Sequence, residues 1–502
     1  MFKNYFKIAF RNIKNYKGYS FINILSLAIG MACCRLSCYG CKMKFKRYIT
    51  IVILGVFLCQ IPLAAVIMPE YQNRKDRRKW NDQFGSKALK SDFIQMRTAL
   101  EKMHPDLYRF TKKDQFDILF QEAYRSLEQP KTLLEFNKII SAIFAQIGCG
   151  HSIVVVPKDY RKNSPERFFP LDIRFLGNRA YVYGNVHPES KIPLGAEILS
   201  INGKSMWEIT RNLTKIMSSD GNRMPNKIYQ LNSKFFVYYM FYYYFPEEYH
   251  VSYLEPGKEI PQSVSIRSVN RGDLSTYRKG RKKVQTSTDD PTLNLEMEDR
   301  LETAIITIKS FGFYGDRNKE FFRFNDDAFL EIKEKGMKTL IVDLRGNSGG
   351  DPYCANYLLS YLAKEPFKYF EKKYEGYEIL NQPTTISKNH FSGKLYILID
   401  EGGFSTTGHL GALLKYHKIG TLVGVETGAS YECNDNTKIV KLENTGLQLY
   451  IPTQTYTVAV KGMSMGKGII PDIFVKIKVS DLLKKEDSIK TVLFDLIKKN
   501  KR

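Results

Sequence analysis

The chain has 502 residues, more than a single hydrophobic core accommodates, so we expect two or three domains. Hydrophobic residues make up 43% and charged residues 25%, proportions that exclude a disordered chain. The formal net charge of +24 is typical of a nucleic-acid-binding protein, but residues 1–80 alone hold fifteen Lys or Arg and two Asp or Glu. These charges flank apolar segments, so they indicate membrane topology, and we expect no nucleic acid among the partners.

Two apolar segments lie near the start of the chain. Residues 21–34 are shorter than the roughly twenty residues that span a bilayer. Residues 48–68 are long enough, and a basic cluster at residues 44–47 precedes them. Because basic flanks stay in the cytoplasm, we expect residues 48–68 to anchor the chain in the membrane with the remainder outside the cytoplasm. An uncleaved anchor within residues 43–75 is preferred to a cleaved signal sequence.

Residues 1–34 resemble the start of permease subunits of macrolide-exporter-type ABC transporters. That resemblance makes a transporter subunit one functional alternative. Nothing downstream continues the multi-span pattern of such permeases, which argues against it. We therefore treat residues 1–42 as a permease-like fragment and exclude them from the fold argument.

Cysteine usage predicts no disulfide framework, and its one metal or redox spacing, Cys38-x-x-Cys41, is a weak signal without a partner pair. Beyond the membrane end the chain has Cys149, Cys354 and Cys433, which are scattered. Such isolated thiols usually pack as small apolar residues. No metal-ligand set is evident, and we expect neither a metal nor a cofactor.

Residues 76–160 form a predicted helical region. Apolar residues recur at helical spacing over residues 91–147, which predicts three helices, and Thr132 with Glu135 form a capping-box pattern at the start of the third. The segment GCGHSIVVVP then turns through two glycines into a strand and leaves His151 at the junction. A histidine there can also be an ordinary turn residue or a buried, hydrogen-bonded one, so its role depends on partners elsewhere.

Residues 165–275 are predicted to form a separate β-rich domain. Its clearest motif is IPLGAEILSING at residues 192–203, a glycine turn, an apolar strand and an Asn-Gly hairpin. This motif resembles the strand-turn signature of PDZ domains, which bind an extended peptide, and it makes Leu194 and Gly195 the predicted peptide-binding residues. The aromatic block at residues 235–245 is predicted to be a core strand, with a substrate- or membrane-facing patch as the alternative. Residues 276–294 are predicted to be an exposed linker.

Residues 295–480 alternate strand and helix patterns, which predicts a parallel sheet covered by helices. Sites in such sheets gather at the carboxyl ends of the strands. Two glycine-rich breaks, at residues 345–350 and 400–403, follow strands and precede helices. Residues 481–502 are predicted to be a basic C-terminal tail.

Ser405 lies at the second of these strand-to-helix breaks. The apolar run at residues 395–399 precedes it, and leucines at helical spacing follow Thr406. Free N–H groups at the start of a helix face a developing anion, so this is a suitable position for a nucleophile. The alternative is that Ser405 only caps the helix.

Two other interpretations of the glycine-rich segments are disfavoured. The segment Arg345–Gly350 lacks the lysine of a phosphate-binding P-loop. The sequence around Ser405, Gly-Phe-Ser-Thr-Thr, is not the Gly-x-Ser-x-Gly elbow of an α/β-hydrolase.

Six motifs in order carry a family resemblance: GCGHS, IPLGAEILSING, DLRGNSGG, EGGFST, VGVETG and GKGIIPDIFV. The chain from residue 91 to residue 479 resembles the tail-specific, C-terminal-processing serine proteases, particularly their tricorn-core branch. The resemblance implies an α/β fold with a crotonase-like ββα core, an interposed PDZ-like domain and a helical N-terminal region. It also implies hydrolysis of peptide bonds through an acyl-enzyme.

By position, the resemblance makes Ser405 the nucleophile and His151 the general base. The N–H of Thr406 and one from Gly349 or Gly350 would form the oxyanion hole, where losing one donor costs about a hundred- to a thousand-fold in rate. A histidine can take the serine proton near neutral pH.

The chain departs from the family pattern at the remaining catalytic positions. The lysine base of the processing branch is replaced by Ser430, and the serine and glutamate of the tricorn branch by Gly150 and Met465. The residue that orients His151 therefore stays open, with Glu426, Ser430 and Glu432 as candidates. His409, one turn after Ser405, is a rival base whose alternative is a solvated helix residue.

The sequence predicts a serine endopeptidase, anchored in the bacterial cell envelope by residues 48–68, with its catalytic part in the periplasm. Its expected partners are polypeptide substrates and the membrane. The alternative is a catalytically inactive peptide-binding module on the same scaffold.

Overall fold

The computed structural model describes residues 80–285, 292–484 and 486–501. Residues 78–502 form one compact unit. The predicted membrane anchor at residues 48–68 and the permease-like residues 1–34 lie outside the described residues. Within the described ranges, no helix combines the length and the apolar character needed to cross a bilayer.

A six-stranded sheet in the order β10-β11-β12-β13-β14-β19 forms the centre of the C-terminal half. Its strands are β10 (Leu293–Glu298), β11 (Thr303–Ile308), β12 (Thr339–Asp343), β13 (Lys394–Ile399), β14 (Thr421–Gly424) and β19 (Ile473–Phe474). The predicted parallel pairing holds from β11 to β19, but β10 is antiparallel to β11. The short turn η3 (Asp299–Leu301) joins these two strands, and a connection of that length permits only antiparallel pairing.

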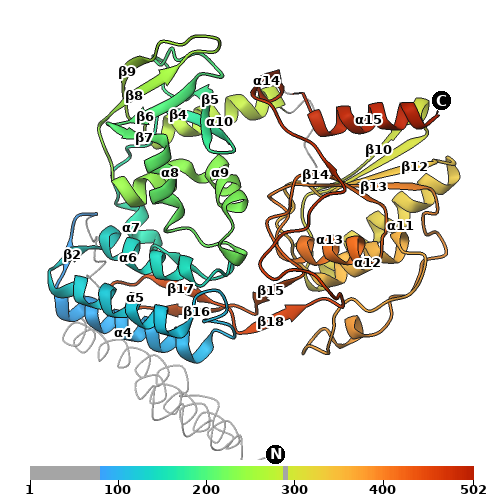
Figure 1. Ribbon diagram of the computed structural model, residues 1–502, viewed down its shortest axis with the longest axis horizontal. Coiled ribbons are helices and arrows are strands. Elements are labelled where there is room, and N and C mark those ends of the chain that lie inside the picture. Colours follow the sequence, from blue (N-terminus) through green and yellow to red (C-terminus); the bar gives the residue numbers. More distant parts are fainter. Residues whose placement is uncertain (1–79, 286–291, 485, 502) are drawn as a thin grey trace, which may run out of the picture. The chain divides into compact units, whose positions relative to one another are not determined.

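Helices cover both faces of this sheet (Figure 1). One face packs against α11 (Asn318–Glu334), α12 (Pro352–Leu362) and α13 (Thr406–Tyr416), and the other against α15 (Ser488–Lys501). Successive side chains of a strand point to opposite faces, so Val342 joins the first core while Ile341 joins the second. Asp351 caps α12 by accepting a hydrogen bond from the N–H of Tyr353 (3.0 Å).

The C-terminal segment is not a tail. Residues 481–502, predicted to be a basic tail, contain most of α14 (Val479–Lys484) and α15. Ile489, Leu493 and Ile497 of α15 recur every four residues and are buried against the central sheet. The lysines between them obscured this apolar stripe in the sequence.

The predicted three-helix region is confirmed, as α4 (Ser86–Met103), α5 (Lys113–Arg125) and α6 (Leu133–Gln146). The capping box is also confirmed, because Thr132 Oγ1 accepts from the Glu135 N–H and the Glu135 carboxylate accepts from the Thr132 N–H. Shorter elements complete the region: β1 (Gln83–Phe84), β2 (Lys131–Thr132), β3 (Ile153–Val155) and α7 (Lys158–Lys162).

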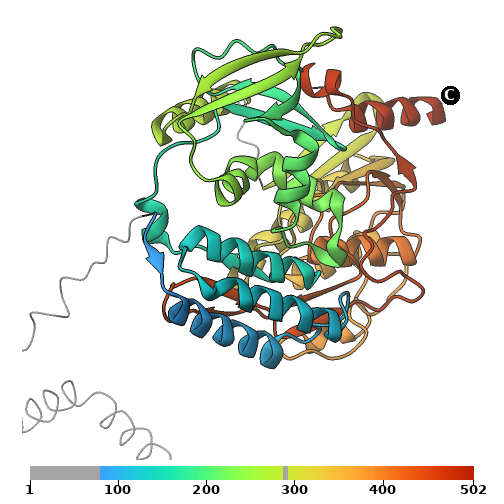
Figure 2. The same cartoon turned by 60° about the vertical axis from the view of Figure 1, so that its left-hand side comes forward.

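Two strands from the far half of the sequence join this helical region (Figures 1 and 2). The hairpin of β16 (Lys438–Lys441) and β17 (Gln448–Ile451) leaves the central sheet, and β17 pairs antiparallel with β3. Leu442, Leu447 and Leu449 pack in the same core as the helices. A further pair, β15 (Glu432–Asp435) and β18 (Gln454–Thr457), bridges the two parts. The strand that follows His151 is thereby tied to the part of the chain that carries Ser405.

A separate, antiparallel sheet has its own hydrophobic core. In sequence it lies between the helical region and the central sheet. Its elements are β4 (Leu171–Leu176), β5 (Arg179–Asn185), β6 (Glu197–Ile201), β7 (Lys204–Ser205), α8 (Met206–Thr214), α9 (Met224–Tyr243), β8 (Glu248–Leu254) and β9 (Gln262–Arg267). The prediction of a strand for the aromatic block at residues 235–245 is wrong, because most of the block is in α9. Phe235 and Tyr239 lie one helical turn apart and are both buried.

The predicted linker also contains a helix, α10 (Arg271–Gln285), which begins before it. Its sequence is strongly polar, and it packs through Tyr277, whose hydroxyl donates to Asp172 of β4 (3.2 Å). One tyrosine in a basic stretch was too weak a pattern to predict this helix.

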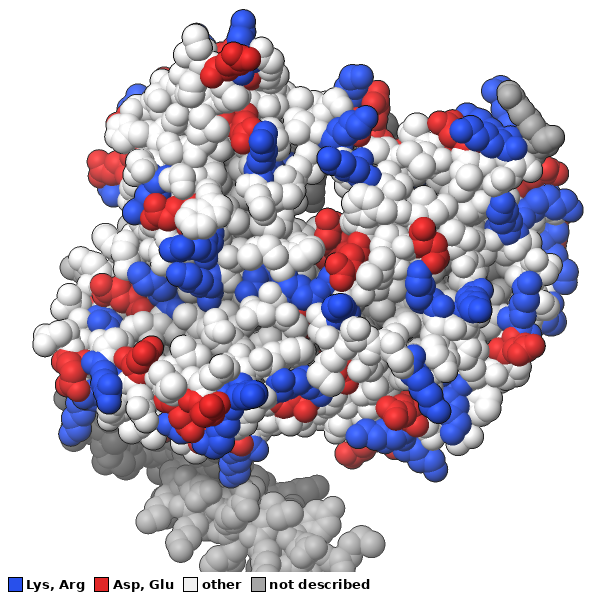
Figure 3. Space-filling view, in the orientation of Figure 1, with Lys and Arg blue, Asp and Glu red and all other residues white. Residues whose placement is uncertain are grey.

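Charged side chains of both signs are interspersed on the face drawn in Figure 3. Among the described residues, some ion pairs join side chains one helical turn apart, such as Arg97 with Glu101 (2.9 Å) and Lys113 with Asp117 (2.6 Å). Pairs of this kind stabilise exposed helices by a few tenths of a kcal/mol each, about 0.3–0.5.

Candidate active site

Ser405 occupies the tight turn between β13 and α13 that the sequence predicts. Its backbone has φ 54° and ψ −124°, a strained conformation for a residue other than glycine, which costs on the order of 1–3 kcal/mol. The hydroxyl makes no capping hydrogen bond, so the capping interpretation is wrong. Instead, Oγ lies 3.9 Å from Sγ of Cys433, and the residue is 8% exposed. The turn therefore holds the hydroxyl away from the helix end.

The loop at residues 345–350 packs directly on this turn. Gly349 has φ +94°, and a Cβ there would lie 2.8 Å from Cβ of Ser405 and 2.9 Å from the nitrogen of Thr406, so only glycine fits. Thr406 Oγ1 donates to the carbonyl of Gly350 (2.6 Å), and the Phe404 N–H donates to the carbonyl of Asn347 (3.1 Å). These contacts fix the loop relative to Ser405.

Two backbone N–H groups near Ser405 are free to bind an anion. Thr406 is the first residue of α13, where an N–H has no acceptor within the helix. The Gly349 N–H donates to Oδ1 of Asn347 (2.8 Å) and is therefore occupied. The Gly350 N–H has no acceptor among the described residues. Of the two glycines predicted for the oxyanion hole, Gly350 is thus the available donor.

His151 lies beside the same turn although it is remote in sequence. Its ring stacks on the ring of Phe404, which directly precedes Ser405, with 4.8 Å between the centroids and 29° between the planes. The side chain is 16% exposed, and Nε2 lies 3.9 Å from Oδ2 of Asp435. In the described part of the chain, no hydrogen bond joins His151 to the Ser405 hydroxyl. The fold brings the two residues to one place without pairing them directly.

None of the three residues predicted to orient His151 forms a hydrogen bond or ion pair with it among the described residues. Glu426 forms an ion pair with Arg223 (2.6 Å), and Glu432 forms one with Arg109 (2.9 Å). The Ser430 hydroxyl is buried and has no hydrogen-bond partner among the described residues.

Two aspartates that no sequence motif indicates lie near His151 instead. Asp435 is on β15, and Asp220 is in the short turn η2 (Asp220–Asn222). Oδ1 of Asp220 accepts a hydrogen bond from the N–H of Gly150 (2.7 Å). Burial raises the pKa of Asp220 above its ordinary value, and the neighbouring His151 opposes that rise. In the sequence, Ser-Asp-Gly-Asn around Asp220 is an ordinary turn pattern, so nothing there indicated its partner.

The alternative interpretation of His409, a solvated helix residue, is wrong, because this residue is 2% exposed. Burial lowers its pKa to about 3, so the ring is neutral near neutral pH. Burial also raises the pKa of the Cys433 thiol well above its ordinary value. The predicted packing of Cys149, Cys354 and Cys433 as buried free thiols is confirmed.

A cavity of about 660 Å³ adjoins the Ser405 turn. Gly150, Ser348 and Phe404 line one part of it, and β3 and α9 line another. Ile153 of β3 is 40% exposed and faces this cavity. Leu194 and Gly195, the predicted peptide-binding residues, lie elsewhere: Leu194 is 53% exposed, and Gly195 lies against Leu483 of α14.

Comparison with known proteins finds a family match for the part of the chain that contains Ser405. Residues 302–475 match the model of Peptidase family S41. No curated protein matches the chain at a significant level. This domain makes the chain a serine-type peptidase, a hydrolase.

Solved structures of similar fold include mature CPAF, with a TM-score of 0.59 and 13% sequence identity over 82% of this chain and 98% of that chain. The photosystem II D1 C-terminal processing protease aligns with a TM-score of 0.41 and 14% identity over 78% of this chain and 93% of that chain. The tricorn protease aligns with a TM-score of 0.39 and 14% identity over 83% of this chain and 37% of that chain.

Proposed function

We propose that this serine-type peptidase, whose residues 302–475 form a Peptidase family S41 domain, cleaves extended polypeptides through an acyl-enzyme on Ser405. His151 acts as the general base. The observation that supports this most directly is the strained Ser405 turn, with the free N–H groups of Thr406 and Gly350 on one side and the His151 ring stacked against Phe404.

In the proposed reaction, Ser405 Oγ attacks the carbonyl carbon of a substrate peptide bond while His151 takes the hydroxyl proton. The carbonyl oxygen becomes an anion, which the N–H groups of Thr406 and Gly350 stabilise. The C–N bond then breaks as His151 returns the proton to the leaving amine. Water, activated by His151, hydrolyses the ester and frees Ser405. The hydrogen bond between His151 and Ser405 forms when substrate binds, because catalytic hydrogen bonds are often long in the free enzyme.

The edge of β3 supports an extended polypeptide as the substrate. Among the described strands, β3 pairs with β17 and leaves its other edge unpaired. The cavity beside Ser405 runs along this strand from residue 153 to residue 156. An unpaired edge next to a cavity can bind a peptide as an additional strand through backbone hydrogen bonds. A folded substrate could not present its backbone in this way.

The same proposal includes the cellular location of the enzyme and a second site that binds its substrate. Residues 48–68 anchor the chain in the bacterial envelope, and the basic cluster at residues 44–47 keeps the catalytic part on the periplasmic side. The sheet of β4–β9 acts as a PDZ-like domain that binds polypeptide tails near Leu194 and Gly195.

Replacing the nucleophile tests the proposal. We expect Ser405→Ala to abolish both the cleavage of reduced, alkylated casein and covalent labelling by a fluorophosphonate, while the thermal unfolding midpoint is retained. Ser360→Ala is the matched control, because Ser360 lies in α12 and its hydroxyl donates to the carbonyl of Tyr357 (2.7 Å). Cleavage by Ser405→Ala would refute the assignment. So would a wild-type protein that binds casein but is neither labelled nor active, which would indicate the peptide-binding module instead.

A further inference from the structure

We propose that Asp220 is the carboxylate that orients His151, and hence that it is a positioning residue of the active site; this inference rests on the proposed function. None of the residues predicted from sequence for this role, Glu426, Ser430 and Glu432, reaches the imidazole. A base that must take a serine proton through one ring nitrogen needs its other nitrogen held by an acceptor. Asp220 is the carboxylate placed to supply that acceptor, because it accepts from the N–H of Gly150, which directly precedes His151.

Two hydrogen bonds tie the turn of Asp220 to the turn that carries His151. The N–H of Gly150 donates to Oδ1 of Asp220 (2.7 Å), and the N–H of Gly221 donates to the carbonyl of Gly148 (2.9 Å). Asp220 is 7% exposed, so water competes little for its carboxylate. These bonds fix the two turns to each other and hold the carboxylate near the imidazole.

One oxygen and one nitrogen in this pair of side chains lack partners. Oδ2 of Asp220 and Nδ1 of His151 are both buried, and neither has a hydrogen-bond partner in the described parts of the chain. Leaving a buried polar atom unpaired costs about 1–3 kcal/mol. A hydrogen bond from Nδ1–H to Oδ2 would satisfy both atoms at once. It would also fix the tautomer in which Nε2 is free to accept the Ser405 proton.

The turn of Asp220 is anchored to the peptidase domain as well. A Cβ at Gly221 would collide with the carbonyl oxygen of Gly466, so the two backbones are in close contact. Arg223, one residue after this turn, donates to the carbonyl of Thr427 (2.7 Å) and pairs with Glu426 (2.6 Å). The turn of Asp220 is thus fixed both by the turn that carries His151 and by residues 426–466, which follow Ser405 in sequence.

Other ionisable groups lie around His151 and Ser405, and they suit this role less well. Asp435 approaches Nε2, the nitrogen that must face Ser405, and its side chain is 45% exposed. His409 on α13 carries no negative charge. Cys433 and Cys149 are buried thiols whose pKa values burial raises, so both are neutral. Asp220 alone among these described groups combines a carboxylate, burial and a tie to the histidine turn.

The test compares Asp220→Asn with Asp435→Asn, using fluorogenic casein and the rate of fluorophosphonate labelling. Asn keeps the acceptor for the Gly150 N–H but presents an NH₂ group where Oδ2 was. We expect Asp220→Asn to lower kcat and the labelling rate by about 10²- to 10⁴-fold, the usual contribution of a positioned base, with KM and the thermal midpoint retained. Asp435→Asn should cause the smaller loss. Full kcat in folded Asp220→Asn, or a larger loss in Asp435→Asn, would overturn the proposal.

A measurement on the unmodified protein covers the case in which Asp220→Asn does not fold. The ¹⁵N shift of His151 Nδ1, identified by its disappearance in His151→Gln, should report a protonated nitrogen in a hydrogen bond. An unprotonated Nδ1 would overturn the inference. If the wild-type protein were inactive and unlabelled, the proposed function would fail, whereas an active wild type with a fully active Asp220→Asn would refute only the role of Asp220.

Discussion

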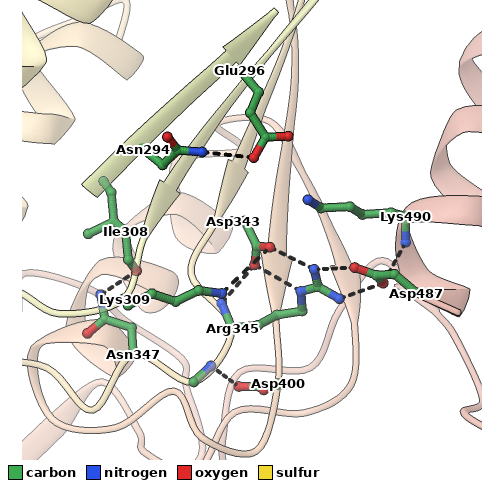
Figure 4. Close-up of polar contacts among 11 residues, drawn as sticks. Asn294, Glu296, Ile308, Lys309, Asp343, Arg345, Asn347, Asp400, Asp487 and Lys490 are labelled. Atoms are coloured by element: carbon green, nitrogen blue, oxygen red, sulfur yellow. Dashed lines mark hydrogen bonds and ion pairs between the residues drawn. The ribbon is translucent and has the colours of Figure 1, made fainter. Parts of the chain in front are cut away.

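Arg345 and Asp487 form an ion pair through two hydrogen bonds, in which Nη1 and Nη2 donate to Oδ1 and Oδ2 at 2.7 Å each (Figure 4). The same guanidinium donates to Asp343 from Nε (2.9 Å) and Nη2 (2.7 Å). Asp343 ends β12, and Asp487 directly precedes α15. Arg345 therefore joins the C-terminal segment to the start of the loop that carries Gly349 and Gly350.

This network predicts a loss of stability in acid. Burial by itself raises the pKa values of Asp343 and Asp487, but the bonds from Arg345 outweigh it, so both lie below the ordinary value of 3.8. A carboxyl with a lowered folded-state pKa stabilises the fold above its unfolded-state pKa, and that stability is lost as the pH falls through the folded-state pKa. We expect the free energy of unfolding, measured by urea denaturation, to decline below pH 3.8. Asp487→Asn should decline less steeply, and an identical slope would contradict the prediction.

Gly349→Ala should disable the enzyme through the Ser405 turn. The added Cβ would overlap Cβ of Ser405 and the nitrogen of Thr406, which displaces the proposed nucleophile, Ser405 Oγ. A misplacement of about 1 Å lowers activity by about a hundredfold, and we expect at least this loss of kcat on casein. Gly376→Ala is the control, since Gly376 has a similar φ of +79° but open space around its Cβ. Both variants should lose similar stability from backbone strain, about 1–2 kcal/mol, so equal activities would contradict the steric argument.

Ile153→Asp should weaken substrate binding at the unpaired edge of β3. The new carboxylate would enter the cavity beside the site and would lose its water when a polypeptide bound there. We expect KM for casein to rise at least tenfold, about 1.4 kcal/mol, with a small change in kcat. Ile439→Asp is the control, because Ile439 is 56% exposed on β16, at the opposite edge of the same sheet. A similar KM in both variants would exclude β3 as the binding edge.

Patterns confined to one turn or one strand were predictable from the sequence. The capping box of Thr132 and the strand-turn-helix around Ser405 depend on neighbours within a few residues. The aromatic block at residues 235–245 was not predictable in this way, because Tyr and Phe suit a strand as well as a helix. Its helical form is decided by the burial of Phe235 and Tyr239 on one face of α9.

The sequence by itself located a serine at a strand-to-helix turn and a histidine after a glycine turn, because backbone shape specifies such turns locally; only the family resemblance joined the two in one expected peptidase site. Only the tertiary structure decided which groups surround them: Gly350 rather than Gly349 is the free N–H donor, and Asp220 and Asp435 rather than Glu426 and Glu432 lie beside His151. The reason is physical. The hydrogen-bond partners and the burial of His151 depend on η2 and β15, which are distant from β3 in sequence. Motif spacing along the chain therefore cannot predict them.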